Sequence, residues 1–264
     1  MNDCNLLFSQ VSIPYWYLWF CVLKYKKTQK GVTMGNTKSI IELELYIIRH
    51  GQSKGNVERV TDGLSHEELH DPRLTDLGKK QAIACGERFK TVEFDAIYSS
   101  ALLRAVETAT EIINKQPSEK ALKVLPYLTE AGVSEEYSHS SFTEINKINK
   151  NAVLADDVDP TKSLFYYNKM SDESDLFERA QKALDYIKSH QNLGEKIAIV
   201  SHAAFITYLV FSLMGYKKEC PLYDLDFKNT GVTKVTIYKK GTNKYGDIVF
   251  EFINDTSHLF GKEF

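Results

Sequence analysis

Two histidines and two arginines stand after short apolar runs of the kind that form buried strands. The four residues are Arg49, His50, Arg104 and His202. Guanidinium groups offer forked donors that match phosphoryl oxygens, and a neutral imidazole can attack phosphorus. These residue types therefore predict a site for a dianionic phosphoryl group, with one histidine as the candidate nucleophile.

The elements that must position these residues alternate between β-rich runs and longer helical segments from Glu42 onward. The predicted strands are 43–48, 94–98, 122–125, 196–200, 234–239 and 248–253. The predicted helices are 75–90, with Thr75 as its N-cap, 101–114, 175–190 and 204–214. This order predicts an α/β fold, a three-layer α/β/α sandwich with a mostly parallel central sheet. Because ligands bind beyond the carboxyl ends of parallel strands, where helix N-termini also gather, the four residues are expected to converge there.

We expect the sequence to divide into an extension, residues 1–41, and one domain that carries the candidate site, residues 42–264. Within the domain, the stretch 131–175 is polar and poorly periodic, which predicts an irregular insertion. Hydrophobic residues make up 43% of the chain and charged residues 26%, which is typical of soluble globular proteins. Lys plus Arg total 33 against 35 for Asp plus Glu, so no global positive field favours nucleic acid as a partner. The four cysteines are scattered, which favours a reducing compartment and a cytoplasmic location.

The extension has two features of its own. The uncharged aromatic run Val11–Leu23 is too short to span a bilayer and lacks the flanks of a signal peptide. A start at Met34 would place Gly35 in the M-G-x-x-x-[ST] pattern of N-myristoylation. We therefore expect residues 1–33 to be a peripheral segment or to be absent from the native protein. Membrane association is expected only if the extension belongs to the native protein or if Gly35 carries a lipid.

Beyond these local features, six motifs in order resemble the histidine phosphatase superfamily, the phosphoglycerate-mutase-like proteins with an R-H-G signature. They are LYIIRHGQSKGN (45–56), DPRLTDLGKKQA (71–82), YSSALLRAVETA (98–109), VLPYLTEAG (124–132), AIVSHAAFI (198–206) and FKNTGVT (227–233). A lone R-H-G is a weak signal, whereas the ordered set is specific. The resemblance covers residues 42–264 and implies the same α/β sandwich.

The resemblance also implies roles for single residues. His50 would become phosphohistidine, and Glu130 would be the general acid and base. Arg49, Arg104, His202 and Asn56 would hold the phosphoryl oxygens, while Gly51 and Ser53 would line the pocket. The implied chemistry needs no metal and no cofactor, and its partner is a small phosphorylated substrate.

Each residue also has an ordinary structural interpretation. A histidine after a buried strand can be a satisfied structural residue. Arg104 could pair with Glu107 or Glu111 on its own helix. Glu130 could be a solvated surface residue, since other glutamates lie nearby.

Three functions fit these motifs. The mutases of the superfamily carry a stretch resembling R-H-Y-G-x-L-x-G-L-N-K after the acid, and this chain reads Glu130-Ala131-Gly132-Val133-Ser134 instead. This difference favours a phosphomonoester phosphatase, a hydrolase, over phosphoglycerate-mutase-type phosphoryl transfer, an isomerase activity. The third possibility is a catalytically silent module that binds a phosphorylated ligand, which the complete set of His, Arg and Glu residues disfavours.

A competing motif, His66-Glu67-Glu68-Leu69-His70, spells the H-E-x-x-H of zinc proteases. That site requires a continuing helix, but Asp71-Pro72 follows at once. We therefore expect a polar loop here and no metal site.

Overall fold

The computed structural model describes residues 38–57, 71–133, 141–159, 162–166, 173–219 and 225–262. Residues Ser39–Phe264 cluster as one compact unit. Its strands are β1 (Ile41–Arg49), β2 (Ala96–Ser99), β3 (Leu122–Val124), β4 (Ala152–Leu154), β5 (Glu195–Ser201), β6 (Val232–Tyr238) and β7 (Ile248–Asp255). Its α-helices are α3 (Asp76–Phe89), α4 (Leu103–Ile113), α5 (Phe142–Ile148), α6 (Glu173–Ser189) and α7 (Ala203–Leu213). Single 3₁₀ turns are η1 (Lys54–Asn56), η2 (Pro126–Leu128) and η4 (Ser257–Leu259).

The seven strands form one sheet in the order β4-β3-β2-β5-β1-β6-β7. Strands β4, β3, β2, β5 and β1 are mutually parallel, and β6 and β7 add an antiparallel edge next to β1. The sheet is therefore mostly parallel, as expected. Strands β2, β5 and β1 are neighbours, so the segments that leave their carboxyl ends emerge side by side.

Strand β1 shows why the central strands are continuous apolar runs. Leu43, Leu45 and Ile47 pack into the core on one face of the sheet, whereas Tyr46 and Ile48 pack into the core on the other. Successive side chains of a strand point to opposite faces, so a strand covered on both sides must be apolar throughout.

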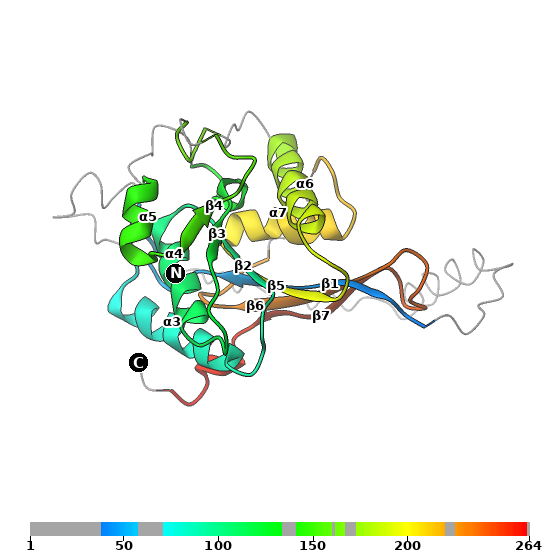
Figure 1. Ribbon diagram of the computed structural model, residues 1–264, viewed down its shortest axis with the longest axis horizontal. Coiled ribbons are helices and arrows are strands. Elements are labelled where there is room, and N and C mark those ends of the chain that lie inside the picture. The colour runs from blue at the N-terminus through cyan, green and yellow to red at the C-terminus, as the bar shows by residue number, and fades with distance from the viewer. Residues whose placement is uncertain are drawn as a thin grey trace, which may run out of the picture. The chain divides into compact units, whose positions relative to one another are not determined.

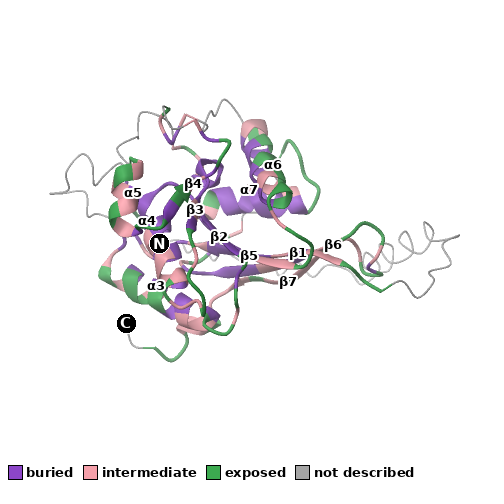
Figure 2. Cartoon of the chain, viewed as in Figure 1, coloured by how far each residue is buried: buried purple, intermediate pink, exposed green. Residues whose placement is uncertain are grey.

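Helices cover both faces of the sheet and complete the three-layer sandwich (Figure 1). The buried side chains of α6 and α7 belong to one core, and those of α3, α4 and α5 belong to the other. Figure 2 shows the central strands and α7 mostly buried, while α3, α5 and α6 expose their outer sides. Among the described residues, none of the helices combines the length and the apolar character that a membrane crossing requires.

The predicted boundaries hold to within about two residues for most elements. Thr75 caps α3 as predicted, because its Oγ1 accepts a hydrogen bond from the Gly78 backbone N at 3.0 Å. The stretch 131–175 is different: it contains α5 and β4, and β4 pairs with β3 in the main sheet. The stretch predicted to be irregular therefore contains two regular elements, which the sequence did not reveal because elements of seven and three residues are too short to show a clear period.

Candidate active site

The four cationic or nucleophilic residues meet at the carboxyl edge of the sheet. Arg49 ends β1 and pairs with Ser201, the last residue of β5. Arg104 lies in the first turn of α4, just after β2, and His202 is the N-cap of α7. The ring centroids of His50 and His202 are 5.0 Å apart. The tertiary structure thus brings together three segments that the sequence separates widely.

The imidazole of His50 is held in one tautomer. Its Nδ1 lies 2.6 Å from the carbonyl oxygen of Gly51, an acceptor, so Nδ1 carries the hydrogen. The Nε of Arg104 donates to His50 Nε2 at 3.3 Å, so Nε2 carries the lone pair. Burial of the ring, and then the charge of Arg104, holds the pKa of His50 well below its usual range. The ring is therefore neutral at pH 7, with its lone pair directed toward the guanidinium.

His202 is also completely buried, but its hydrogen bonds are arranged differently. Its Nε2 lies 2.7 Å from the hydroxyl of Ser100, the residue after β2. Its Nδ1 has no hydrogen-bond partner among the described residues, although it is buried. Burial, followed by the charge of Arg104, lowers the pKa of His202 well below its usual range. A buried nitrogen without a partner is costly, which makes Nδ1 a candidate contact for a ligand.

Arg104 is anchored to a buried acid rather than to its own helix. Its Nη1 lies 3.5 Å from Asp71 Oδ1, and both side chains are almost wholly buried. Asp71 also accepts from the Leu103 backbone N at the start of α4. Glu107, one of the partners considered from the sequence, pairs with Arg73 instead. Arg104 is therefore a buried, oriented cation and not a solvated helical arginine.

Arg49 turns its guanidinium toward the loop before β6. Its Nη1 donates to the carbonyl oxygen of Phe227 at 2.6 Å, and its buried Nε has no partner among the described residues. Burial lowers the pKa of Arg49, while the charge of Glu130 raises it, and the side chain stays a cation.

Glu130 follows η2 and lies against the N-terminus of α7. Its Oε1 accepts from the backbone N of Ala131 at 2.8 Å and of Phe205 at 3.0 Å. Its charge raises the pKa of Arg49, Arg104 and Arg179, which places the carboxyl group in the same electrostatic environment as the cations. The structure thus brings Glu130 to the site and shows that it is not a solvated surface residue.

The loop after His50 contains the remaining predicted residues. Asn56 Oδ1 accepts from the backbone N and the Oγ of Ser53, at 3.1 and 3.2 Å. Ser53 is almost wholly buried, so its hydroxyl supports Asn56 within the loop. Gly51 lies against the first turn of α3, where an added Cβ would be only 2.5 Å from the carbonyl oxygen of Gly78. A side chain at position 51 would force the loop away from α3.

The sequence alone assigned no role to five residues that contact the site or contribute charge to it. All five are polar, and each lies in one of the six motifs or in a predicted helix. They are Asp71, Ser100, Thr108, Arg179 and Asn229. Thr108 accepts from the Gly51 backbone N at 3.1 Å, and its spacing of four residues from Arg104 places both on one face of α4. That spacing is the one signal that could have found a missed residue. The others become site residues only through contacts across the fold.

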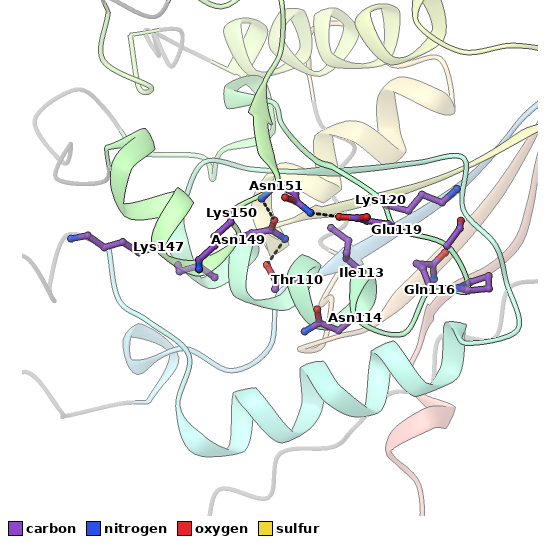
Figure 3. Close-up of a pocket in the computed structure, with 13 residues that line it drawn as sticks. Thr110, Ile113, Asn114, Gln116, Glu119, Lys120, Lys147, Asn149, Lys150 and Asn151 are labelled. Carbon is purple, nitrogen blue, oxygen red and sulfur yellow. Dashed lines mark hydrogen bonds between the residues drawn. The ribbon is translucent and has the colours of Figure 1, made fainter.

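A separate pocket of about 560 Å³ lies at the other edge of the sheet, between the C-terminal end of α4 and the segment joining α5 to β4 (Figure 3). Its polar side chains bind one another. Asn149 donates to Thr110 at 3.2 Å, and Asn151 donates to Glu119 at 2.7 Å. Figure 3 shows Lys147 pointing away from the pocket.

Three predictions concern residues outside the described part of the chain. His66 and His70 of the H-E-x-x-H motif lie there, as do Gly35 of the lipidation pattern and the aromatic run Val11–Leu23. Within the described ranges, no group of three or more His, Cys, Asp or Glu side chains is arranged to hold a metal ion.

Known proteins resemble this chain in sequence and in fold. A phosphoglycerate mutase of Schizosaccharomyces pombe is 29% identical over 181 residues, 65% of this chain and 79% of the relative. A 2,3-bisphosphoglycerate-dependent phosphoglycerate mutase of Bartonella henselae is 39% identical over 93 residues, 34% of this chain and 43% of the relative. The match thus spans less than half the length of the Bartonella protein.

Among solved structures, a phosphoserine phosphatase from Entamoeba histolytica in complex with 3-phosphoglyceric acid superposes with a TM-score of 0.52. It is 26% identical, and the match covers 82% of this chain and 99% of that one. The family model of the histidine phosphatase superfamily (branch 1) matches residues 45–245, which include every buried cation described above. With the ordered motifs, the mostly parallel sandwich and this match in agreement, the chain belongs to the histidine phosphatase superfamily.

Proposed function

We propose that this protein is a phosphomonoester phosphatase that works through a phosphohistidine on His50. The observation that carries the proposal is the fixed tautomer of His50, in which Nδ1 is bound to the Gly51 carbonyl and Nε2 faces Arg104. A nucleophile needs a lone pair aimed into a site that attracts its substrate. Here the lone pair faces the guanidinium that would hold the phosphoryl group.

In the first step, the lone pair of His50 Nε2 attacks phosphorus and the P–O ester bond breaks. The electron pair of that bond goes to the leaving oxygen, which takes a proton from Glu130. Oε1 of Glu130 already accepts two backbone hydrogen bonds, so the transferable proton belongs on Oε2. Protonation of the leaving group is worth about a hundredfold or more in rate.

In the second step, water attacks the phosphohistidine and the P–N bond breaks, which returns the electron pair to His50 Nε2. Glu130, now a carboxylate, takes a proton from the water, and inorganic phosphate leaves. Arg49, Arg104 and His202 Nδ1 would hold the phosphoryl oxygens through both steps, with Asn56 adding a contact from the loop. Positioning and charge are the main contributions a protein makes to phosphoryl transfer. Cationic side chains supply both here, and the proposed chemistry has no step that uses a metal ion or a cofactor.

Phosphoglycerate-mutase-type transfer is the second candidate, because mutases are among the relatives in sequence. A mutase returns the phosphoryl group to a substrate, whereas a phosphatase admits water. The residues after Glu130 lack the stretch that marks the mutases, which favours hydrolysis. The phosphoserine phosphatase bound to 3-phosphoglyceric acid suggests small phosphorylated acids as the first substrates to test. A cytoplasmic location is part of the proposal, on the evidence of the scattered cysteines.

The test begins with phosphoenzyme trapping from a ³²P-labelled phosphomonoester. We expect an acid-labile, alkali-stable phosphoprotein that disappears in His50→Ala and persists in His190→Gln, a change at an exposed histidine just after the end of α6. Release of inorganic phosphate from phosphoserine and 3-phosphoglycerate identifies a phosphatase. Isomerisation of 3-phosphoglycerate, primed with 2,3-bisphosphoglycerate, identifies a mutase. A chain that forms no phosphoenzyme and releases no phosphate across a panel of phosphate esters would be a silent binding module.

A second measurement concerns metal dependence. We expect full activity in EDTA and inhibition by vanadate, which mimics the trigonal phosphoryl group that Arg49 and Arg104 would hold. Loss of activity in EDTA that zinc restores would contradict the metal-free reaction and would redirect attention to His66 and His70.

A further inference from the structure

Thr230 has a backbone conformation that a β-branched residue rarely adopts. Its φ is +55°, in the left-handed region, and the residue is fully buried. Such a conformation is costly for a β-branched residue and persists only where its surroundings impose it. The conformation lets the Thr230 backbone N–H reach the carbonyl oxygens of Arg49 at 3.0 Å and of His50 at 3.3 Å. The strained residue thus binds the backbone of the two residues at the centre of the site.

The neighbours of Thr230 in the 227–231 loop bind the same segment. Asn229 Nδ2 donates to the His50 carbonyl oxygen at 3.0 Å and to Asn56 Oδ1 at 3.3 Å. The Phe227 carbonyl accepts from Arg49, as described above. The 227–231 loop therefore fixes the backbone of His50, and the fixed backbone in turn orients the imidazole.

His258, in η4 near the C-terminus, supports this loop from behind. The turn packs beside α3, as Figure 1 shows in red. His258 Nε2 lies 3.0 Å from Thr230 Oγ1, and Nδ1 lies 3.3 Å from Arg88 Nη1. Arginine only donates, so Nδ1 accepts and Nε2 carries the hydrogen that goes to Thr230. The Thr230 hydroxyl in turn donates to the Asn229 carbonyl at 2.8 Å.

The far end of this chain of hydrogen bonds is itself anchored. Arg88 Nη2 pairs with Asp255 Oδ2 at 2.7 Å, and its guanidinium lies 5.3 Å from the centre of the Phe252 ring. Burial, and then the charge of Arg88, lowers the pKa of His258 to about 4, so the ring keeps one neutral form near pH 7. In the series from Arg88 through His258 and Thr230 to the Asn229 carbonyl, each group therefore donates a hydrogen bond to the next.

We propose that His258 is a positioning residue for the phosphohistidine reaction: its Nε2–H holds Thr230 in the left-handed conformation, and Thr230 holds the Arg49 and His50 carbonyls. This inference rests on the proposed role of His50 as nucleophile. Two of the proposed phosphate-binding groups, Arg104 and His202, come from other elements, and among the described residues neither side chain forms a hydrogen bond with the 227–231 loop. Arg49 and Asn56 do contact the loop, so only part of the phosphate site depends on it. Loss of the His258 contact should therefore slow the attack on phosphorus more than it weakens substrate binding.

The experiment compares paired variants. His258→Phe keeps a ring and removes the donor, whereas His258→Gln keeps an N–H near the position of Nε2. Thr230→Val removes the hydroxyl and keeps the shape, and Thr230→Ser keeps the hydroxyl. Thr242→Val is the matched control, because this hydroxyl, in the turn between β6 and β7, binds the backbone of Ile40 and Lys239. The readouts are kcat, KM, the single-turnover rate of phosphoenzyme formation and Tm.

We expect His258→Phe and Thr230→Val to lower kcat and the phosphorylation rate by about tenfold to a hundredfold, the cost of a small misplacement of a reacting group. KM should change by less than about threefold, and His258→Gln, Thr230→Ser and Thr242→Val should stay within about threefold of the wild type. The proposal would be overturned if His258→Phe folded and kept the wild-type kcat. It would also be overturned if His258→Gln were as impaired as His258→Phe. If His258→Phe does not fold, the Thr230 pair decides by the same criteria.

The test separates this inference from the proposed function. If the wild type forms no phosphoenzyme, the proposed function fails. The positioning inference is then judged by NMR of the His50 Nδ1–H, whose hydrogen bond to Gly51 should change its shift in His258→Phe and not in Thr242→Val. An unchanged shift would contradict it. If the wild type does form the phosphoenzyme and His258→Phe forms it equally fast, only the positioning inference is wrong.

Discussion

The two edges of the parallel sheet differ in how far the hydrogen bonds of their polar groups are satisfied. At the amino ends of β3 and β4, a pocket of about 560 Å³ is lined by amides and lysines that are largely exposed or bound to each other. At the carboxyl ends of β1, β2 and β5, the site places buried cations and imidazoles together, and Arg49 Nε and His202 Nδ1 lack partners among the described residues. Buried polar atoms without partners are costly to a fold, whereas satisfied ones cost little. In this chain, the site is therefore identified by buried polar atoms that lack hydrogen-bond partners among the described residues, and not by the volume of a pocket.

The sharpest test of this contrast is Arg104→Leu. The variant removes the donor to His50 Nε2 and the buried cation of the site, so we expect kcat to fall by about a thousandfold. It also leaves Asp71 buried without this charge, which should lower the free energy of unfolding by about 3 kcal/mol. Steady-state kinetics and urea denaturation measure the two effects. Arg73→Leu, which breaks an exposed pair with Glu107, is the control, and a similar loss of kcat there would contradict the assignment.

Glu130→Gln tests the proposed acid. The amide cannot supply a proton, so kcat for phosphoserine should fall by about a hundredfold. An aryl phosphate such as p-nitrophenyl phosphate has a leaving group that needs no proton, so its phosphorylation step should be nearly unaffected. The ratio of single-turnover rates for the two substrates measures the role directly. An equal loss for both would show that Glu130 holds α7 in place and does not act as the acid.

The pH dependence follows from the lowered pKa values of His50 and His202. The ordinary value is 6.5, and both rings lie well below it in the folded protein. Above pH 6.5 both states are neutral and the full stability is present. Below it the unfolded chain takes up protons first, so the free energy of unfolding should fall as the pH falls toward the folded-state pKa values. Urea denaturation at pH 7.5, 6.5 and 5.5 measures this, and NMR should show neither ring titrating near 6.5. A titration of His50 near that value would contradict a buried, neutral nucleophile.

The smallest effect is expected at the other edge of the sheet. Asn149→Ala removes the hydrogen bonds to Thr110 and to the Asn151 backbone, which should lower the free energy of unfolding by about 1 kcal/mol. Because the pocket lies at the far ends of the strands, kcat and KM should change by less than about twofold. Thermal denaturation and steady-state kinetics test the two statements. A large change in kcat would mean that the two edges are coupled.

Much of the fold could be predicted because its signals are local. The apolar run of β1, the Thr75 cap and the periodic helices are each set by residues a few positions apart. The elements α5 and β4 could not be found in this way, since β4 is a strand only because it pairs with β3. Short edge strands depend on neighbours that the local sequence does not show.

The site divides in the same way. Residue types and spacing, with the ordered motifs, indicated the family and the sandwich, because motifs are carried by contiguous segments. They also predicted a candidate site made of His50, Arg49, Arg104, His202 and Glu130. Only the tertiary structure decided which nitrogen of His50 holds the proton, that Asp71 rather than Glu107 partners Arg104, and that hydrogen bonds link His258 to Thr230 and Thr230 to the His50 backbone. These outcomes depend on distances between groups far apart along the chain, and such distances exist only after the sheet has assembled.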